Sequence, residues 1–128
     1  MAQTLLGGDA REQLVSTCRT SIGDSLRSLT YFTRTDYEQL YLRGDLEQDA
    51  DLSTFIGHEW RDYEQTQDSY GNSELGEYRY TIRTFENGFL LRVTTTNEGV
   101  FLTTDGLTIQ QFDKVATAVR RTLDTWRD

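Results

Sequence analysis

Apolar residues recur at helical spacing in two stretches of the first half of the chain. The first stripe predicts a helix over about residues 10–25, and Asp9 followed by Glu12 predicts a capping box at its start. The second stripe follows an acidic stretch and predicts a helix over about residues 46–66. The first stripe is Leu14, Val15, Cys18, Ile22 and Leu26, and the second is Leu52, Phe55, Ile56, Trp60 and Tyr63.

A third apolar stripe near the carboxyl end has the clearest start signal. Thr108 and Gln111 have the spacing of a capping box, and Leu107 before the cap can contact Phe112 as a hydrophobic staple. The sequence therefore predicts a helix from about residue 109. Its stripe is Phe112, Val115, Ala116, Val119, Leu123 and Trp126.

Between these helices lie short aromatic and β-branched segments that are typical of strands. The predicted strands cover residues 29–33, 37–43, 78–85, 89–96 and 100–104. The polar residues 67–77 predict a mobile loop, and residues 1–8 are expected to be flexible. The chain of 128 residues has the size of one domain, 1–128. The expected fold class is α+β, a five-stranded antiparallel sheet with three helices in the order α-β-β-α-β-β-β-α.

Two glycine-containing dipeptides set the expected register of the last three strands. Asn87-Gly88 and Glu98-Gly99 are read as two-residue turns, which places Arg83 opposite Arg92. One face then carries an apolar set that meets the first and third helices, namely Ile82, Leu91, Val93, Val100 and Leu102. The other face carries Arg79, Arg83, Arg92, Thr81, Thr94 and Thr103.

The arginines on this second face require an anionic partner, because like charges directly opposite each other destabilise a sheet. In one interpretation the helix over 46–66 covers the face and Glu59, Asp62 or Glu64 supplies the carboxylates. In the other, Arg79, Arg83 and Arg92 bind an acidic protein or an anionic ligand, since guanidinium groups match carboxylate and phosphate geometry.

The chain has 21 acidic and 13 basic residues, a formal charge of −8 and a pI of about 4.6. This charge opposes binding to nucleic acid or to anionic membranes. All basic residues except Lys114 are arginine, and proline is absent. This profile resembles cytoplasmic proteins of extremely halophilic archaea, and the chain looks similar to short acidic haloarchaeal proteins. With a single cysteine and no secretory signal, a cytoplasmic location is expected.

No set of residues in the sequence predicts catalysis, a metal site or a cofactor. His58 is the only histidine, and a surface pair with Asp62 is the simplest expectation. Cys18 lies on the apolar stripe of its helix, and Lys114 lies off the stripe of its own. Residues 45–51 alternate acidic side chains but lack the glycine and the final glutamate of a calcium loop.

The order and length of the elements resemble those of the roadblock and longin-like group, which shares a profilin-like architecture. This resemblance implies a small dimeric scaffold that often sits beside GTPases, and it is an analogy of fold. PAS and GAF sensor domains are the nearest competitors, but PAS domains usually place several helices where this chain has room for one.

The sequence thus favours a non-catalytic adaptor that forms a homodimer and contacts an unidentified protein, for which the resemblance suggests a small GTPase. The expected shared surface is Phe55, Trp60 and Tyr63 with the edge strand 78–85, because aromatic side chains are enriched at interface cores. The ordinary alternative is that these aromatics cover the sheet. A second candidate is a PAS- or GAF-like sensor with an apolar pocket between sheet and helix, and an enzyme acting through carboxylates alone is a third.

Overall fold

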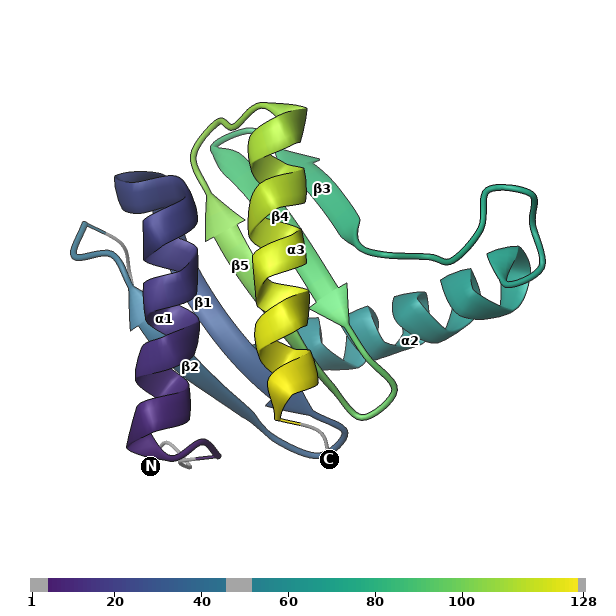
Figure 1. The fold of residues 1–128 in the computed structure, drawn as a ribbon, viewed down its shortest axis with the longest axis horizontal. Coiled ribbons are helices and arrows are strands. Elements are labelled where there is room, and N and C mark those ends of the chain that lie inside the picture. The colour runs from purple at the N-terminus through teal and green to yellow at the C-terminus, as the bar shows by residue number, and fades with distance from the viewer. Residues whose placement is uncertain (1–4, 46–51, 127–128) are drawn as a thin grey trace.

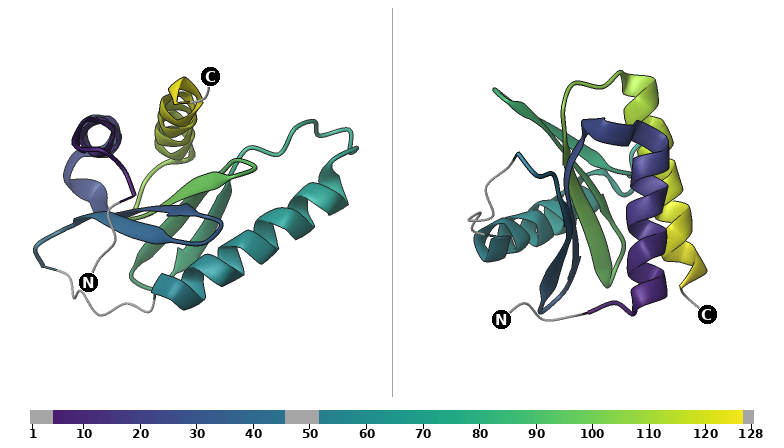
Figure 2. Two further views of the ribbon diagram at one scale, coloured as in Figure 1. Left: turned by 90° about the horizontal axis from the view of Figure 1, so that it is seen from below. Right: turned by 90° about the vertical axis from the view of Figure 1, so that its left-hand side faces the viewer.

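The computed structural model describes residues 5–45 and 52–126, and it arranges them in three layers (Figures 1 and 2). Two helices, α1 and α3, lie side by side on one face of a sheet, and a third, α2, crosses the opposite face. The elements are α1 (Gly8–Ile22), a 3-10 turn (Gly23–Ser25), β1 (Leu26–Thr33), β2 (Tyr37–Leu42), α2 (Leu52–Tyr70), β3 (Thr81–Phe85), β4 (Gly88–Thr94), β5 (Glu98–Thr104) and α3 (Ile109–Thr125).

The sheet has five antiparallel strands in the order β2-β1-β5-β4-β3. The predicted fold class and element order are confirmed. Strand β1 of the β1–β2 hairpin pairs with β5 of the β3–β4–β5 meander, so that β2 and β3 are the two edge strands. The β1–β2 hairpin lies where the sequence places it, although β1 begins three residues earlier, at Leu26.

The larger apolar core lies between the sheet and the pair α1 and α3. Fully buried residues from the sheet, such as Leu91 and Leu102, meet fully buried residues of the helices, such as Leu14 and Val119. The apolar face predicted from strand alternation is therefore confirmed. A smaller cluster lies under α2 and is formed by Phe32, Ile56, Trp60, Tyr63, Leu90 and Phe101.

The two predicted capping boxes have different outcomes. At α3 the backbone N–H of Gln111 donates to the Thr108 hydroxyl, and the backbone N–H of Thr108 donates to the side-chain oxygen of Gln111. At α1 the prediction is wrong, because the helix begins before Asp9 and its N-cap is Gly7. Asp9 still lies in the first turn, where a carboxylate is favoured by the helix dipole.

The predicted turns in the second half of the sheet are also wrong. Glu86 and Asn87 form the first turn, with Phe85 opposite Gly88, and Gly99 lies inside β5 opposite Thr94. At both glycines another part of the chain approaches too closely for a side chain to fit. A Cβ on Gly88 would lie 2.6 Å from the carbonyl oxygen of Thr104, and one on Gly99 would lie 2.5 Å from the ring of Phe32.

The predicted boundaries of α2 and of the flexible segments also differ from the structure. The α2 helix continues to Tyr70, so the loop expected over 67–77 starts four residues later, and the start expected at residue 46 lies outside the described residues. Within the flexible segment expected over 1–8, the amides of Leu5 and Leu6 both donate to Glu38. A carboxylate that is 4% exposed therefore attaches this part of the chain to β2.

Candidate functional site

Arg92 lies at the centre of the face that α2 covers, and its side chain is completely buried. Its Nη1 donates to Glu59 Oε1 at 2.7 Å and to the Glu59 carbonyl oxygen at 3.0 Å, and it lies 2.9 Å from Asp62 Oδ2. Its Nη2 donates to Thr81 Oγ1 at 2.8 Å and to the hydroxyl of Tyr78. A buried guanidinium thus meets two carboxylates of one helix, which offset much of the cost of burying the charge.

Arg83 completes this cluster from the edge strand. Its Nε donates to Glu59 Oε2 at 3.2 Å, and its Nη2 lies 3.0 Å from Glu59 Oε1 and 3.2 Å from Asp62 Oδ2. The hydrogen bonds to Glu59 raise the pKa of Arg83 above its usual value. We call Arg83, Arg92, Glu59 and Asp62 the arginine–carboxylate cluster; it contains two charges of each sign.

The carboxylates of this cluster belong to the chain itself, so the structure follows the interpretation in which α2 covers the arginine face. Arg92 is inaccessible to a ligand in this arrangement, and Arg83 is occupied. Glu64, the third predicted carboxylate, pairs instead with Arg34. The prediction that Asp62 pairs with His58 is wrong, because Asp62 contacts the two arginines and His58 is exposed.

The predicted strand register is wrong, but the prediction that Arg83 and Arg92 are neighbours on the same face of the sheet is confirmed. Arg83 lies opposite Leu90 and Arg92 lies opposite Thr81, so the two arginines are diagonal neighbours. The predicted β3–β4 pairing is two positions off and the predicted β4–β5 pairing is four positions off. Because side chains alternate with a period of two, an even error leaves every residue on its predicted face.

Arg79 is separate from the other two arginines. It precedes β3, is exposed, and borders a hollow beside α3 that Arg120 and Asp124 also line. Its predicted place on the α2 face is wrong, because the segment before β3 is not a strand and does not keep the alternation. It forms no ion pair with any residue that the structure describes.

The three aromatics expected at a shared surface of α2 have different positions. Trp60 and Tyr63 are buried against the sheet, where the Trp60 Nε1 donates to the carbonyl oxygen of Thr33 at 3.0 Å. Arg34 stacks over the Trp60 ring at 4.0 Å from its centroid. Trp60 and Tyr63 are thus unavailable to a partner in the single chain, which corrects that expectation, while Phe55 remains 44% exposed.

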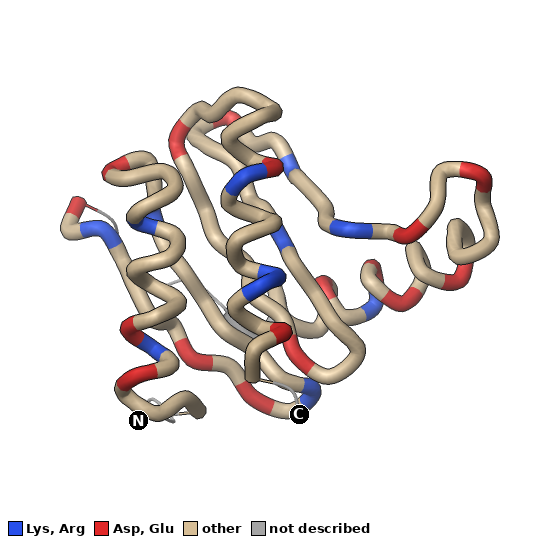
Figure 3. Tube along the Cα trace, viewed as in Figure 1, with Lys and Arg blue, Asp and Glu red and all other residues tan. Residues whose placement is uncertain are grey.

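The edge strand β3 is open to solvent on its outer side. Its five residues are half-buried or exposed, and Phe85 at its end is 59% exposed. The second half of α2 continues past this edge before the chain turns back to β3 (Figures 1 and 2). The second half of α2 carries the exposed Glu64 and Asp68, and the loop that follows carries the exposed Glu74 and Glu77. Figure 3 shows acidic positions along this projecting helix end and loop.

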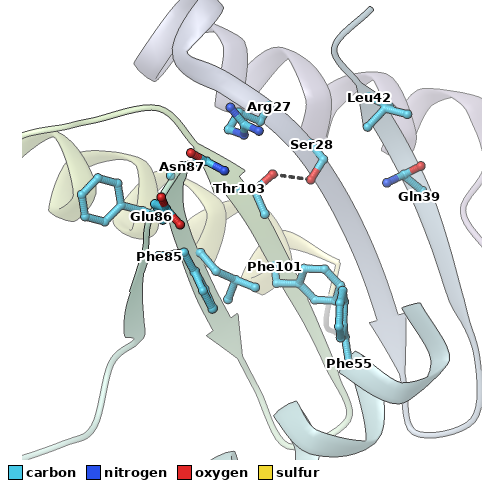
Figure 4. Close-up of a pocket in the computed structure, with 13 residues that line it drawn as sticks. Arg27, Ser28, Gln39, Leu42, Phe55, Phe85, Glu86, Asn87, Phe101 and Thr103 are labelled. Carbon is cyan, nitrogen blue, oxygen red and sulfur yellow. Dashed lines mark hydrogen bonds between the residues drawn. The ribbon is translucent and has the colours of Figure 1, made fainter. Parts of the chain in front are cut away.

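The α2 face also contains a hollow that α2 leaves uncovered. It has a volume of about 450 Å³ and lies between the start of α2, the β3–β4 hairpin and strands β1, β2 and β5 (Figure 4). Phe55 and Phe85 stand on its two sides, and Arg27 lies at its upper rim in this view. The sequence predicts an apolar pocket between the sheet and this helix for the sensor alternative, but it does not predict these lining residues, since only the fold brings them together.

Cys18 and Lys114 lie outside the arginine–carboxylate cluster and the hollow, and all but the first residue of the acidic stretch 45–51 lie outside the described residues. Burial raises the pKa of the Cys18 thiol to about 12, so it stays protonated at neutral pH. Lys114 is exposed on α3. Within residues 5–45 and 52–126, no three histidine, cysteine or carboxylate side chains are placed to hold a metal ion. Among the helices described, none combines the length and apolarity needed to cross a membrane.

Comparison with solved structures assigns the fold. The gliding protein MglB from Thermus thermophilus superposes with a TM-score of 0.66 at 13% identity, over 98% of each chain. A structure of MglB with a tetrameric arrangement gives a TM-score of 0.65 at 12% identity, again over 98% of each chain. Together with the element order, these similarities define a roadblock-like α+β fold.

Comparison with protein families assigns the chain more closely. Residues 12–124 match the model of a family described as a domain of unknown function, DUF7522. The chain belongs to this family. No curated protein matches the sequence.

Proposed function

We propose that this protein is a non-catalytic interaction module that forms a homodimer through β3 and acts as an adaptor or regulator of another protein. The observation that carries the proposal is the open edge of β3, next to a helix that projects beyond it. An edge strand presents unpaired N–H and C=O groups, which a second strand can satisfy. Two copies related by a twofold axis would present the same edge to each other.

The projecting part of α2 gives this edge a second contact surface. A strand added to β3 would lie near the projecting part of α2 (Figure 2), whose last turns include residues that are exposed in the single chain, such as Gln67 and Tyr70. Backbone pairing would supply affinity, and side chains of α2 would supply selectivity. The fold analogy supports self-association, because the roadblock and longin-like group contains small dimeric scaffolds and one solved MglB structure has a tetrameric arrangement.

The second partner is proposed from the fold analogy alone. Members of the group often sit beside GTPases, so a small GTPase is the partner class that we propose. What supports a non-catalytic role is that Glu59, the most buried carboxylate of the arginine–carboxylate cluster, is held by Arg83 and Arg92.

We further propose that the module works in a salt-rich cytoplasm. Its charge of −8 includes the exposed acidic residues of the projecting part of α2 and the following loop, which two associating copies would bring closer together. Salt screens this repulsion. Both folding and dimer formation are therefore expected to strengthen as KCl rises, which circular dichroism and light scattering over a KCl series would measure.

The dimer is tested by light scattering in molar KCl with a variant of the edge strand. Thr84 is exposed in β3, and Thr84→Pro removes one backbone donor. The expected result is a dimer for the wild type and a monomer for Thr84→Pro. Thr84→Val is the matched control, because it keeps the donor and the β-branched shape, and it should remain dimeric.

A wild-type monomer at high concentration in molar salt would refute the proposed dimer. A dimer that persists in folded Thr84→Pro would place the interface elsewhere. Affinity purification from a salt-rich lysate then addresses the partner: a co-purifying GTPase supports the adaptor, and a retained small molecule instead supports a sensor.

A further inference from the structure

The hollow on the α2 face has the dimensions and lining of a small-molecule site. Its volume of about 450 Å³ lies within the usual range for ligand pockets. The buried Leu90 and Phe101 are among its lining residues, and Phe55 and Phe85 stand at its sides (Figure 4). These side chains come from α2, β3, β4 and β5, so the site exists only in the folded chain.

The opposite end of the hollow is polar and rich in hydrogen-bond donors. Arg27, Ser28, Asn87 and Thr103 lie there in Figure 4. The hydroxyls of Ser28 and Thr103 are 2.6 Å apart and bond to each other, which leaves one of their two protons for a ligand. The hollow is thus apolar at one end and donor-rich at the other.

Arg27 has donors to spare. Among the described residues its guanidinium makes one hydrogen bond, to Asp105 at 3.2 Å, whereas Asp105 is held more closely by Arg43 at 2.7 Å. A guanidinium group has five N–H donors, so most of those on Arg27 have no partner among residues 5–45 and 52–126. Its side chain is 24% exposed, which lets it reach a ligand without leaving the rim.

The apolar end presents more hydrophobic surface than packing of the single chain requires. Phe55 is 44% exposed and Phe85 is 59% exposed, although both line the same hollow. Large apolar side chains that converge on a concave surface mark binding sites more often than isolated exposed ones do. The flat faces of aromatic rings favour a ligand that is itself flat or aromatic.

We propose that this hollow binds a small amphipathic carboxylate, with its aromatic or bulky apolar body between Phe55 and Phe85 and its carboxylate on Arg27. Hydrogen bonds from the Asn87 amide and from the Ser28 and Thr103 hydroxyl pair complete the recognition of the head group. Glu86, also on the rim, is exposed and can remain hydrated. This inference goes beyond the proposed dimer: every group that it uses belongs to one chain, and only Phe85 also lies on the dimer strand β3.

The test is an NMR titration of the ¹⁵N-labelled protein, in the salt in which it folds, with 2-naphthoate and with 2-naphthylmethanol. The two probes share an aromatic body and differ in the head group. Saturable shifts are expected for residues around the hollow, with 2-naphthoate binding about tenfold more tightly, which corresponds to about 1.4 kcal/mol, because a hydrogen bond to a charged group is stronger than one to a neutral group.

Three variants separate the two ends of the site. Arg27→Gln should reduce 2-naphthoate binding to the level of the alcohol, and Phe85→Ala should weaken both probes by a similar factor. Ile109→Ala is the matched control, because Ile109 is 69% exposed at the start of α3, which lies on the opposite face of the sheet from α2. It should change neither affinity.

Absence of saturable binding by either probe would overturn the proposal. Equal affinity for the acid and the alcohol would overturn the assignment of the head group to Arg27. Because Arg27 also pairs with Asp105, the circular dichroism of Arg27→Gln is compared with that of the wild type; if that variant is unfolded, Phe85→Ala decides, and unchanged binding in it would overturn the site.

Discussion

The two faces of the sheet are built in opposite ways. The face under α1 and α3 is closed by apolar side chains such as Leu91 and Leu102, which are completely buried. The face under α2 has a buried arginine at its centre, an aromatic cluster around it and an uncovered hollow at one side. The same five strands therefore support an apolar core on one side and a polar, incompletely filled surface on the other.

In this chain, different interactions stabilise the fold and position α2. Apolar burial is non-directional, so the core under α1 and α3 stabilises the fold over a range of helix positions. The arginine–carboxylate cluster is directional, because its bonds require Glu59 to lie directly over Arg92. We interpret this cluster as the feature that fixes α2 on the sheet, and with it the position of the projecting end beside β3.

The largest expected effect comes from removing the buried charge. Arg92→Ala leaves Glu59 and part of Asp62 without their main partner, and Arg83 alone cannot satisfy both carboxylates. The expected loss in the free energy of unfolding is roughly 3–5 kcal/mol. Arg83→Ala should cost less, since its side chain is 25% exposed. Urea denaturation measures both, and equal losses would contradict the central role given to Arg92.

The apolar face is tested by Leu102→Ala, which creates a cavity under α1 and α3. The expected loss is about 3 kcal/mol, from the lost transfer free energy and the unfilled volume. Unlike the loss in Arg92→Ala, this loss should be the same in moderate and in saturated KCl, because no charge is involved. A strong salt dependence of the Leu102→Ala effect in urea titrations would show that the two faces are not independent.

Arg34→Ala should produce a smaller effect that is restricted to the α2 face. The variant loses the stacking on Trp60, two hydrogen bonds to the Thr96 carbonyl oxygen and the exposed pair with Glu64. The expected loss is about 1–2 kcal/mol. Hydrogen exchange should show faster exchange in α2 and unchanged rates in α1 and α3; a uniform increase would argue against separate layers.

The smallest expected effect is a dependence on pH at the edge of the hollow. Hydrogen bonds from Arg43, and then from Arg27, lower the pKa of Asp105 below its usual value. Its stabilising contribution is present above the ordinary aspartate pKa and is lost as the pH falls through the lowered value. The melting temperatures of wild type and Asp105→Asn should therefore converge in acid, and a constant difference down to low pH would contradict this.

The sequence was sufficient to predict the layers, because strand alternation and helical stripes depend on local spacing. Ile82 and Leu91 lie on one face and Arg83 and Arg92 on the other whichever turn is chosen, provided that the error is even. Thr108 and Gln111 also form the predicted capping box, since every group in that motif is local.

The turns and the hollow could not be predicted in the same way. Gly88 and Gly99 suggested turns, but each is small because another part of the chain approaches it, and such contacts between distant residues leave no local signal. The same holds for Arg27, Phe55 and Phe85, which are separated in sequence and meet only when the hairpins and α2 pack together. Trp60 illustrates the same problem. An apolar stripe on a helix indicates which face is buried, but it does not say whether the sheet or a partner protein covers that face.

The most direct test of the account is amide hydrogen exchange in β3, measured in molar KCl at a high and at a low protein concentration. Pairing of two β3 edges predicts that outward-facing amides of Thr81–Phe85 are protected at high concentration and exchange rapidly on dilution, while β2 exchanges equally at both concentrations. Exchange in β3 that is independent of concentration, or protection that appears in β2 instead, would contradict the proposed interface.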